Sequence, residues 1–384
     1  MKKKLNAPEL KKLEKFCHNL DYGALFLFKS KITKHCSPKL FYPLQEELVC
    51  NNLQEVTRFF QQIEKHLKKG HYVAGYFSYE LGYAWHKQKP KNKLSNTPLA
   101  WLGVFDKPSL IALQQINKLI TSKTRGLFPD YWLKKLSPGI NWLKYLKALQ
   151  AIKKHISQGD TYQVNYTFPL KTQVIGNPIT LFWDMYQQQP VNYAALLRNK
   201  QQNILSLSPE LFFERSQQKI VMCPMKGTAA RITNQAQDEK VFHQLAKSVK
   251  NRAENLMIVD LLRNDLGRIC QTGKIKVKKL FQIEKYKTIY QMISTLNGEL
   301  NLAVKWEEIF RSIFPCGSVT GAPKINTMQL ISNLEYYARG IYTGALGYIT
   351  PEHQAIFNVP IRTLINNSRD KSAYFNIGSG IVAD

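Results

Sequence analysis

Residues 194–228 read AALLRNKQQNILSLSPELFFERSQQKIVMCPMKGT and contain four short apolar runs in close succession. The runs cover 194–197, 203–208, 211–214 and 219–223, and polar residues or proline separate them. Short apolar runs bounded by turn-forming residues are typical of β-strands. We therefore predict that a group of consecutive strands lies at the centre of this fold.

Further strands and helices are predicted on both sides of this region. Runs rich in aromatic and apolar residues predict strands at 22–28, 72–79, 99–105, 161–170, 343–349, 355–365 and 372–377. Apolar residues at spacings of three and four predict helices at 53–68, 142–156, 237–262 and 304–313, and a last helix that opens near Pro323. Strands that cluster between long helices predict an α+β fold with mixed α/β layers, and not a doubly wound parallel sheet. Pro138-Gly139 suggests a boundary, so the predicted domains are an N-terminal subdomain, 1–138, and a catalytic domain, 139–384.

The chain of 384 residues carries 54 Lys and Arg against 27 Asp and Glu, which gives a formal net charge of +27. A strongly basic chain raises nucleic acid as a partner. The basic residues are mostly lysine and are spread along the whole chain, whereas arginine is the better group for bidentate recognition of phosphates and bases. Because no nucleic-acid motif is present, we interpret the charge as a solvated, lysine-rich surface.

The cysteines and the apolar runs argue against several other classes of protein. The six cysteines form no C-x-x-C pair and no cluster with zinc-finger spacing. No apolar run approaches the roughly 20 residues that span a bilayer, and the basic N-terminus lacks the apolar stretch of a signal peptide. We therefore predict a cytoplasmic protein with neither a nucleic-acid partner nor a membrane partner.

Two short motifs follow predicted strands and carry groups that can act in catalysis. Ser208-Pro209-Glu210 ends an apolar strand, where a glutamate is either a proton donor in a buried site or a solvated loop residue. Lys226 follows the next strand but one, in Pro224-Met225-Lys226-Gly227-Thr228. A lysine is a nucleophile only where its surroundings favour the neutral amine, since a free lysine is almost fully charged near neutral pH. A surface lysine in a turn is the alternative.

Two further motifs suit a metal ion and an anion. The segment 254–265 begins with Glu254 and is rich in apolar residues, so its acids need partners, either Mg²⁺ or a nearby arginine. In the segment 317–324, GSVTGAPK, small residues precede Pro323, and proline suits the first turn of a helix. Backbone N–H groups at such a helix start can hold an anion, although the P-loop pattern is not satisfied.

Taken in order, these motifs resemble the successive blocks of the chorismate-utilising enzymes. The blocks are Ser208-Pro209-Glu210, Lys226-Gly227-Thr228, 254–265, 317–324, 341–345 (IYTGA), 361–363 (IRT) and 378–384 (GSGIVAD). The resemblance is dense over residues 140–384 and looser at 75–80 (GYFSYE) and 98–101 (PLAW). It implies the fold of that family, two β-sheets packed face to face with helices outside.

Three positions favour the aminodeoxychorismate-forming members of the family. Lys226 stands where members that form anthranilate, isochorismate or salicylate usually carry another residue. Gln163 stands where the water-adding members place a lysine general base, and Gln291 stands where anthranilate-forming members usually carry histidine. The resemblance therefore implies conversion of chorismate and ammonia to 4-amino-4-deoxychorismate, for 4-aminobenzoate and folate synthesis. An anthranilate-forming enzyme and an inactive remnant remain the alternatives.

The resemblance also implies a role for each matching residue. Lys226 would attack the substrate ring while Glu210 protonates the departing hydroxyl, and Glu254 would bind Mg²⁺. The expected substrate-binding residues are Gly227, Thr228, Thr320, Gly321, Tyr342, Arg362, Gly378, Ser379 and Gly380. Since no glutaminase motif is evident, ammonia is expected from a separate glutamine amidotransferase subunit.

The position of Asp384 gives rise to one more expectation. Members of the family usually continue beyond this point into a helix that carries a further glutamate. We therefore expect that the chain is C-terminally truncated. We also expect weak Mg²⁺ binding, because this ion needs six oxygen ligands and one glutamate supplies few of them.

Overall fold

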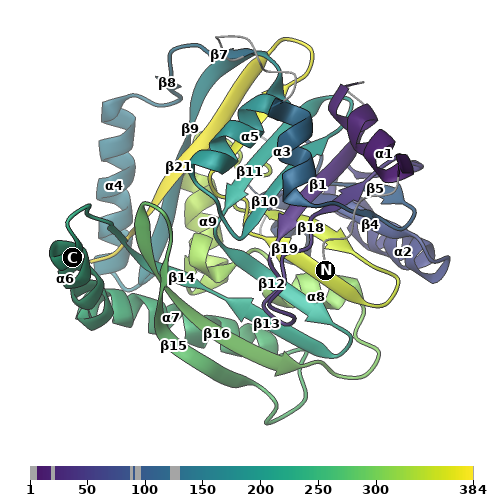
Figure 1. Ribbon diagram of the computed structural model, residues 1–384. Coiled ribbons are helices and arrows are strands. Elements are labelled where there is room, and N and C mark those ends of the chain that lie inside the picture. Colours follow the sequence, from purple (N-terminus) through teal and green to yellow (C-terminus); the bar gives the residue numbers. More distant parts are fainter. Residues whose placement is uncertain (1–6, 19–21, 87–89, 91–96, 122–129, 384) are drawn as a thin grey trace.

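The computed structural model describes residues 7–18, 22–86, 90, 97–121 and 130–383. Over these residues the chain forms two antiparallel sheets with helices around them (Figure 1). The first sheet has the strand order β17 (Gly321–Ala322), β9 (Gln163–Gly176), β21 (Ser372–Ile381), β20 (Thr363–Asn367), β11 (Gln202–Ser208), β10 (Tyr193–Arg198), β1 (Gly23–Phe28), β2 (Lys39–Phe41) and β6 (Ser109–Leu110), and β7 (Tyr131–Leu133) and β8 (Ser137–Pro138) pair with β9. The second sheet has the order β14 (Met225–Ala230), β16 (Ile289–Glu299), β13 (Lys219–Cys223), β12 (Leu211–Ser216), β19 (Gln354–Asn358), β18 (Ala345–Ile349), β4 (Tyr72–Phe77), β5 (Ala100–Phe105) and β3 (Glu46–Cys50), and β15 (Lys276–Lys285) pairs with β16.

The two sheets pack face to face around a shared apolar core. Every residue of β1 is buried, because successive side chains of a strand point to opposite faces and both faces are covered. Phe26 and Phe28 point into the core between the sheets, and Leu25 and Leu27 point outward to the helices. Across the core, the ring of Tyr348 from the second sheet lies 5.4 Å from that of Phe26.

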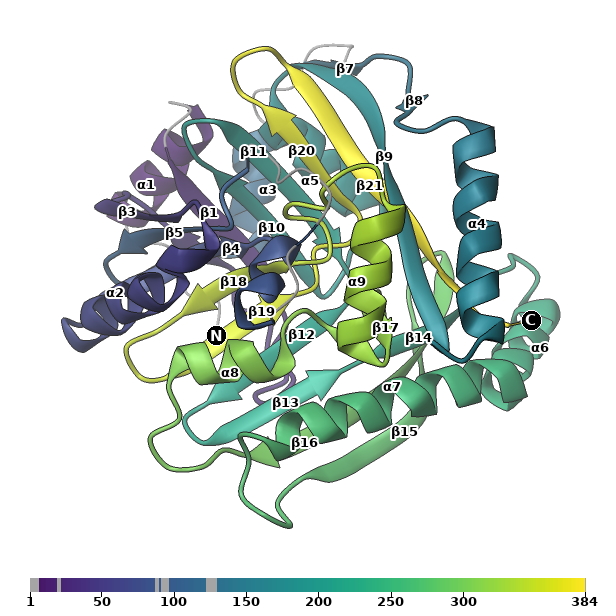
Figure 2. The same cartoon turned by 180° about the vertical axis from the view of Figure 1, so that it is seen from behind.

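Helices cover the outer faces of both sheets and one end of the first sheet (Figure 2). The first sheet is covered by α1 (Ala7–His18), α3 (Leu113–Thr121) and α5 (Pro178–Gln188), and the second by α2 (Val56–Lys68), α7 (Val249–Gly267) and α8 (Trp306–Ile313). The helices α4 (Trp142–Ser157) and α9 (Lys324–Leu334) pack against the long strands β9 and β21. The helix α6 (Gln235–Lys247) lies beside β14, β15 and β16. The short 3₁₀ helices are η1 (Leu53–Glu55), η2 (Tyr79–Trp85) and η3 (Gly317–Val319).

This arrangement confirms the predicted α+β fold of two sheets with helices outside. Within the described part of the chain, none of the helices has the length and hydropathy that crossing a bilayer requires. Strands from before residue 138, such as β1 and β4, pair with β10 and β18 from after it. The division into domains at residue 138 stays a prediction.

Two predictions are wrong in the same way: a single element was predicted where the structure has two consecutive elements. The predicted helix at 237–262 is interrupted at Ser248, whose hydroxyl caps α7 by accepting a hydrogen bond from the backbone N–H of Asn251. The predicted strand at 355–365 is β19 followed by β20, which belong to different sheets. The apolar pattern continues through both breaks, so periodicity alone does not reveal them.

Other differences concern single segments. Trp142, which was predicted on the apolar face of its helix, has 68% of its surface exposed. The segment 86–93 is polar, basic and contains proline, which predicts a surface loop, and it lies mostly outside the described residues. The strands β15 and β16 lie in a stretch of sequence for which no strand was predicted.

Candidate active site

The two places where the chain crosses between the sheets lie side by side and form the base of the site. Ser208-Pro209-Glu210 links β11 of the first sheet to β12 of the second, and the segment 359–362 links β19 of the second sheet back to β20 of the first. Backbone hydrogen bonds join these crossings: Val359 N–H donates to Glu210 O at 3.1 Å, and Leu207 N–H donates to Arg362 O at 3.0 Å. Glu210 and Arg362 are thereby fixed at one end of the sandwich.

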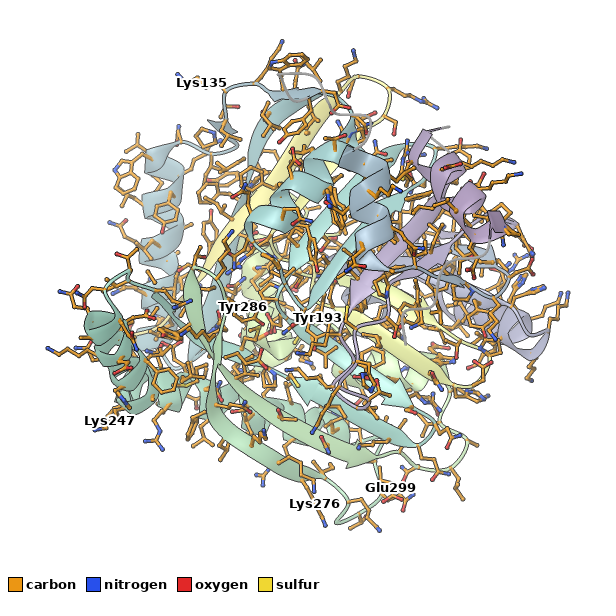
Figure 3. All side chains as sticks on the ribbon, in the orientation of Figure 1. Lys135, Tyr193, Lys247, Lys276, Tyr286 and Glu299 are labelled. Atoms are coloured by element: carbon orange, nitrogen blue, oxygen red, sulfur yellow. The ribbon has the colours of Figure 1, made fainter. Side chains whose placement is uncertain are left out.

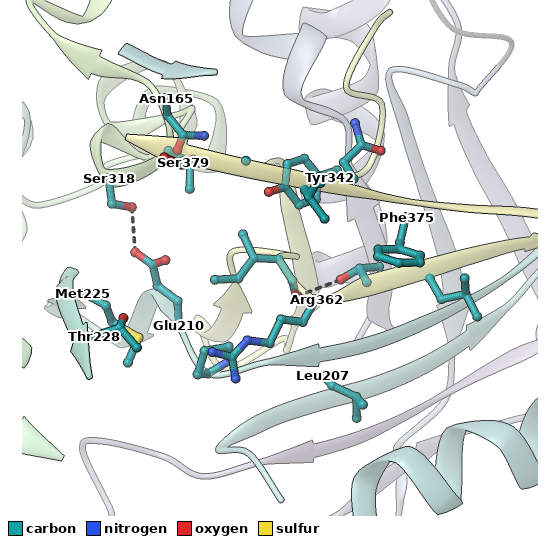
Figure 4. Close-up of a pocket in the computed structure, with 18 of the residues that line it drawn as sticks. Asn165, Leu207, Glu210, Met225, Thr228, Ser318, Tyr342, Arg362, Phe375 and Ser379 are labelled. Carbon is teal, nitrogen blue, oxygen red and sulfur yellow. Dashed lines mark hydrogen bonds between the residues drawn. The ribbon is translucent and has the colours of Figure 1, made fainter. Parts of the chain in front are cut away.

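Glu210 is a buried carboxyl that accepts hydrogen bonds from the Ser318 hydroxyl and from the backbone N–H of Met225. Its exposed fraction is 3%, and the Ser318 hydroxyl donates to its Oε1 at 2.6 Å (Figure 4). Burial raises the pKa of Glu210 to about 7, although the Ser318 hydroxyl and the nearby Lys226 oppose this shift. A substantial fraction of Glu210 is therefore protonated at neutral pH, the form that a proton donor needs.

Lys226 lies on the edge strand β14, at an irregularity in its pairing with β16 that the side chain of Gln291 helps to hold. The side chain of Gln291 accepts from the Thr228 hydroxyl at 2.9 Å and donates to Gly227 O at 3.0 Å. Gly227 has φ +85°, a conformation that suits glycine. Burial lowers the pKa of Lys226, while the carboxylates of Glu210 and Glu254 raise it. The amine is thus moved toward the neutral form that attacks carbon.

A cavity of about 940 Å³ brings most of the predicted site residues together. Its wall includes Glu210, Lys226, Gly227, Thr228, Glu254, Tyr342, Arg362, Gly378, Ser379 and Gly380. Figure 4 labels Glu210, Thr228, Tyr342, Arg362 and Ser379 among them. Two predicted residues, Thr320 and Gly321, are not on this wall. Thr320 is completely buried and its hydroxyl bonds to Cys316 O and Gly317 O, and Gly321 pairs with β9. They support the loop that carries Ser318 and do not face the cavity.

Comparison with known proteins shows the family to which this chain belongs. Residues 33–384 match the model for chorismate binding enzyme. The chain belongs to the chorismate binding enzyme family. Anthranilate synthase component I from Streptococcus pneumoniae has a TM-score of 0.75 at 23% identity, with 90% of this chain and 87% of that chain covered, which shows the shared fold.

Two curated relatives have a higher sequence identity to this chain than that anthranilate synthase has. Aminodeoxychorismate synthase from Streptomyces pristinaespiralis is 39% identical over 241 residues, which are 62% of this chain and 33% of that protein. Aminodeoxychorismate synthase component 1 from Escherichia coli is 36% identical over 241 residues, which are 63% of this chain and 53% of that protein. The match therefore spans about half or less of the length of these curated relatives.

Several groups that matter to this chorismate binding enzyme were not among the predicted site residues. Ser318 and Asn165 line the cavity, and Ser318 binds the carboxyl of Glu210. Gln163 lies behind Gly380, is completely buried, and has no hydrogen-bond partner on either amide atom among the described residues. The 317–324 motif contained Ser318, but a serine that bonds to a carboxylate 108 positions away has no local pattern by which to find it.

Glu254 is the acid that could hold the Mg²⁺ expected for this family. It lies on α7, lines the cavity and is close enough to Lys226 to influence its pKa. Among the described residues, no three or more His, Cys, Asp or Glu side chains gather as a metal site would need. One carboxylate fits a Mg²⁺ ion that takes its remaining oxygens from a bound ligand and from water, the common arrangement for this ion.

The glycines of β21 form a wall that leaves little room for a side chain. A Cβ atom at Gly380 would lie 3.0 Å from Nε2 of Gln163 and 3.5 Å from Nζ of Lys226. We predict that Gly380→Ala weakens binding of the ligand in this cavity by about tenfold, because the methyl group occupies space between the two side chains. Isothermal calorimetry with chorismate would measure this loss.

Gly267→Ala is the matched control for this prediction. A Cβ atom at Gly267 has no neighbour within 4 Å, and the residue ends α7. Chorismate affinity should therefore be unchanged in this variant. Equal affinity of the Gly380→Ala and wild-type proteins would show that the glycine wall does not contact the ligand.

Proposed function

We propose that this chain is an aminodeoxychorismate synthase component I, which converts chorismate and ammonia to 4-amino-4-deoxychorismate for 4-aminobenzoate and folate synthesis. The observation that carries the proposal is the pair of Lys226, whose pKa is lowered by burial, and Glu210, whose pKa is raised by burial, in one cavity. The names of the two curated relatives point to the same reaction.

The two side chains complement each other in this reaction. The neutral amine of Lys226 attacks C2 of chorismate, the two conjugated ring double bonds both shift, and the C4 hydroxyl leaves as water with the proton of Glu210. Ammonia then attacks C4, both double bonds shift back, and Lys226 leaves C2 as the free amine. Glu210 takes up the proton that the new amino group releases, so both side chains return to their starting forms.

The rest of the cavity wall suits the charges of the substrate, which is a dianion. The guanidinium of Arg362 and the backbone N–H groups of residues 378–380 would hold the carboxylate of the pyruvyl group. Tyr342 lines the same wall, and burial raises its pKa to about 12, so its hydroxyl stays neutral and can donate a hydrogen bond. Mg²⁺ on Glu254, when bound, would neutralise the ring carboxylate.

Gln163 favours ammonia over water as the incoming nucleophile. Water needs a base to take its proton before it attacks carbon, and an amide cannot do this, whereas ammonia attacks as the free base. The amide of Gln163 lies against Gly380 and its described surroundings leave its hydrogen-bonding atoms without partners. Position 163 therefore supplies no group that could take a proton from water.

The ammonia would come from a separate glutamine amidotransferase subunit. The relative from Escherichia coli is named as component 1, a name that implies a second component for that protein. We place this reaction in the cytoplasm, where thiols stay reduced, and none of the six cysteines, all of them among the described residues, forms a disulfide.

Product analysis tests the proposed function directly. The chain is incubated with chorismate, Mg²⁺ and ammonium, and the product is treated with the lyase that releases 4-aminobenzoate from aminodeoxychorismate. Formation of 4-aminobenzoate supports the proposal. Fluorescent anthranilate, formed without the lyase, would identify the chain as an anthranilate synthase, and no product at any Mg²⁺ concentration would identify an inactive remnant.

The role of Glu254 makes a separate prediction. Glu254→Gln should raise the Mg²⁺ concentration that gives half-maximal rate by about tenfold, because the amide loses the negative charge that attracts the ion. Calorimetric titration of Mg²⁺ in the presence of chorismate gives a second readout, independent of turnover. Asp260→Asn is the matched control: Asp260 lies on the same helix, is exposed and pairs with Arg263 at 2.6 Å. A Mg²⁺ requirement that is the same in both variants would rule out Glu254 as the ligand.

A further inference from the structure

Arg339 lies directly behind the cavity wall and uses all of its side-chain donors. It is 1% exposed, and it is not one of the residues that line the cavity. Its Nε and Nη2 donate to the two carboxylate oxygens of Glu335 at 2.9 and 2.7 Å. The remaining N–H groups donate to Val319 O at 2.7 Å, to the Thr343 hydroxyl at 3.3 Å and to Asn165 O. A guanidinium has five N–H donors, so none is left over.

Three of these acceptors, Val319, Asn165 and Thr343, lie on the cavity wall or next to a residue of it. Val319 follows Ser318, whose hydroxyl binds Glu210. Asn165 lines the cavity and is the β-sheet partner of Gly380. Thr343 follows Tyr342. The Arg339 side chain thus connects the loop that carries Ser318, the strand pair that contains Gly380, and the segment that carries Tyr342, which are far apart in the sequence.

Two buried carboxylates hold Arg339 in turn. Glu335 also accepts from the backbone N–H of Thr167 at 2.9 Å, and Thr167 is the partner of Gly378 in the sheet. Glu80, from the N-terminal part of the chain, accepts from the backbone N–H groups of Arg339 and Gly340 at 2.7 and 3.0 Å. Glu335 therefore fixes the plane of the Arg339 guanidinium, and Glu80 fixes the backbone from which this side chain extends.

We infer that Arg339 is a positioning residue for Glu210, acting through the loop that carries Ser318 and through the wall formed by Asn165 and Gly380; the inference rests on the proposed function. Ser318 donates to Oε1 of Glu210 and so helps to fix the direction of this carboxyl in the cavity. Arg339 keeps Ser318 in place by holding the next carbonyl along the chain, that of Val319. Lysine could not replace Arg339, because one ammonium group cannot reproduce the five hydrogen bonds that the planar guanidinium makes to four residues.

The groups around Glu210 decide what loss of this support would do. Lys226, Ser318, Cys316 and Tyr342 are the polar or titratable side chains that interact with Glu210 electrostatically or by hydrogen bonds. Of these, the Ser318 hydroxyl stabilises the ionised carboxylate by its hydrogen bond. If Ser318 moves away, Glu210 keeps its proton to a higher pH. The pH at which the rate declines on the basic side then rises.

The test compares Arg339→Lys with Arg198→Lys in the full chain. Arg198 is a matched buried arginine: it is 2% exposed, donates to Asn203 and Phe16, and lies over the ring of Phe16 as Arg339 lies over that of Tyr79. We expect Arg339→Lys to lower kcat about tenfold, to change the KM for chorismate less than threefold, and to move the basic limb of the pH profile upward. Arg198→Lys should change none of these, even if it lowers the Tm. Kinetic changes that are the same in both variants would overturn the inference.

Hydrogen exchange separates this inference from the proposed function. The backbone amides of Asn165 and Thr167 are hydrogen-bonded within this network. They should exchange at least about tenfold faster in Arg339→Lys than in wild type, and at an unchanged rate in Arg198→Lys. This readout needs no turnover, so it holds even if the chain makes another product. Unchanged exchange at 165–167 and 317–320 would overturn the inference.

A second variant applies if Arg339→Lys does not fold. Glu335→Gln removes the negative charge from the Arg339–Glu335 ion pair and should move the basic limb of the pH profile upward in the same way. An unshifted basic limb in this variant counts against the inference.

Discussion

Lys226→Ala is expected to abolish a covalent adduct between this chain and chorismate, and to lower turnover by at least about 10³-fold, which is about 4 kcal/mol of transition-state stabilisation. Without ammonia, the second attack cannot occur, so the ring should remain attached to Nζ of Lys226 in the wild-type protein. Alanine has no nucleophile at this position. Intact-protein mass spectrometry after incubation with chorismate alone would show the adduct in the wild type and its absence in the variant.

Lys171→Ala is the control for this experiment. Lys171 lies on β9, and its amine is 5.0 Å from the centre of the Tyr337 ring, away from the cavity wall. Adduct and turnover should both survive this change. An adduct of the same mass and yield in Lys226→Ala would show that another group is the nucleophile. Normal turnover without any adduct would show that ammonia displaces the hydroxyl directly.

The environment of Lys226 differs from that of most of the lysines, and this explains why net charge says little about function. Lys135, Lys247 and Lys276 are exposed and point away from the body of the molecule (Figure 3). Such side chains keep their charge in water and serve solubility. Lys226 is set apart by the irregular strand segment that Gln291 holds and by the two nearby carboxylates that influence its pKa. Position, and not the sum of +27, is what lowers the pKa of this one amine.

Much of the fold could be predicted because its central strands are short apolar runs between clear turns. The four runs in 194–223 correspond to β10, β11, β12 and β13. The same reasoning failed for β15, which is mostly exposed and carries Lys276, Lys278, Lys279 and Lys285. A lysine-rich strand at the edge of a sheet resists pairing with other chains, but its sequence does not look like a strand.

The candidate site could be predicted residue by residue but not as an arrangement. Glu210 and Arg362 are 152 positions apart, and they come together because two crossings between the sheets are hydrogen-bonded to each other. Thr320 and Ser318 occupy the same motif, yet Ser318 faces the cavity and Thr320 faces the protein. A motif names the segment, whereas the direction of each side chain depends on backbone turns and on partners such as Arg339 that lie elsewhere in the chain.

Glu210→Gln is expected to lower kcat by about 10²–10⁴-fold, the range for loss of a general acid, with a small change in affinity for chorismate. Glutamine keeps the shape of the side chain and can still accept the hydrogen bond from the Ser318 hydroxyl. It has no proton to give to the departing hydroxyl, and hydroxide is a poor leaving group. Turnover and calorimetric binding of chorismate, measured on the same sample, would separate the two effects.

The pH dependence of the rate provides the sharper part of this prediction. Because the protonated form of Glu210 is the active one and burial raises its pKa to about 7, the wild-type rate should decline as the pH rises through this value. The basic limb should be absent from the residual activity of Glu210→Gln, since the amide does not titrate. Glu214→Gln is the matched control: Glu214 is a buried carboxyl on β12 that accepts from the Ser30 hydroxyl and from the Lys31 N–H, outside the cavity. Its loss should leave kcat and the basic limb as they are in the wild type. If the limb persists in Glu210→Gln, another group donates the proton, and Glu210 serves only to bind the substrate.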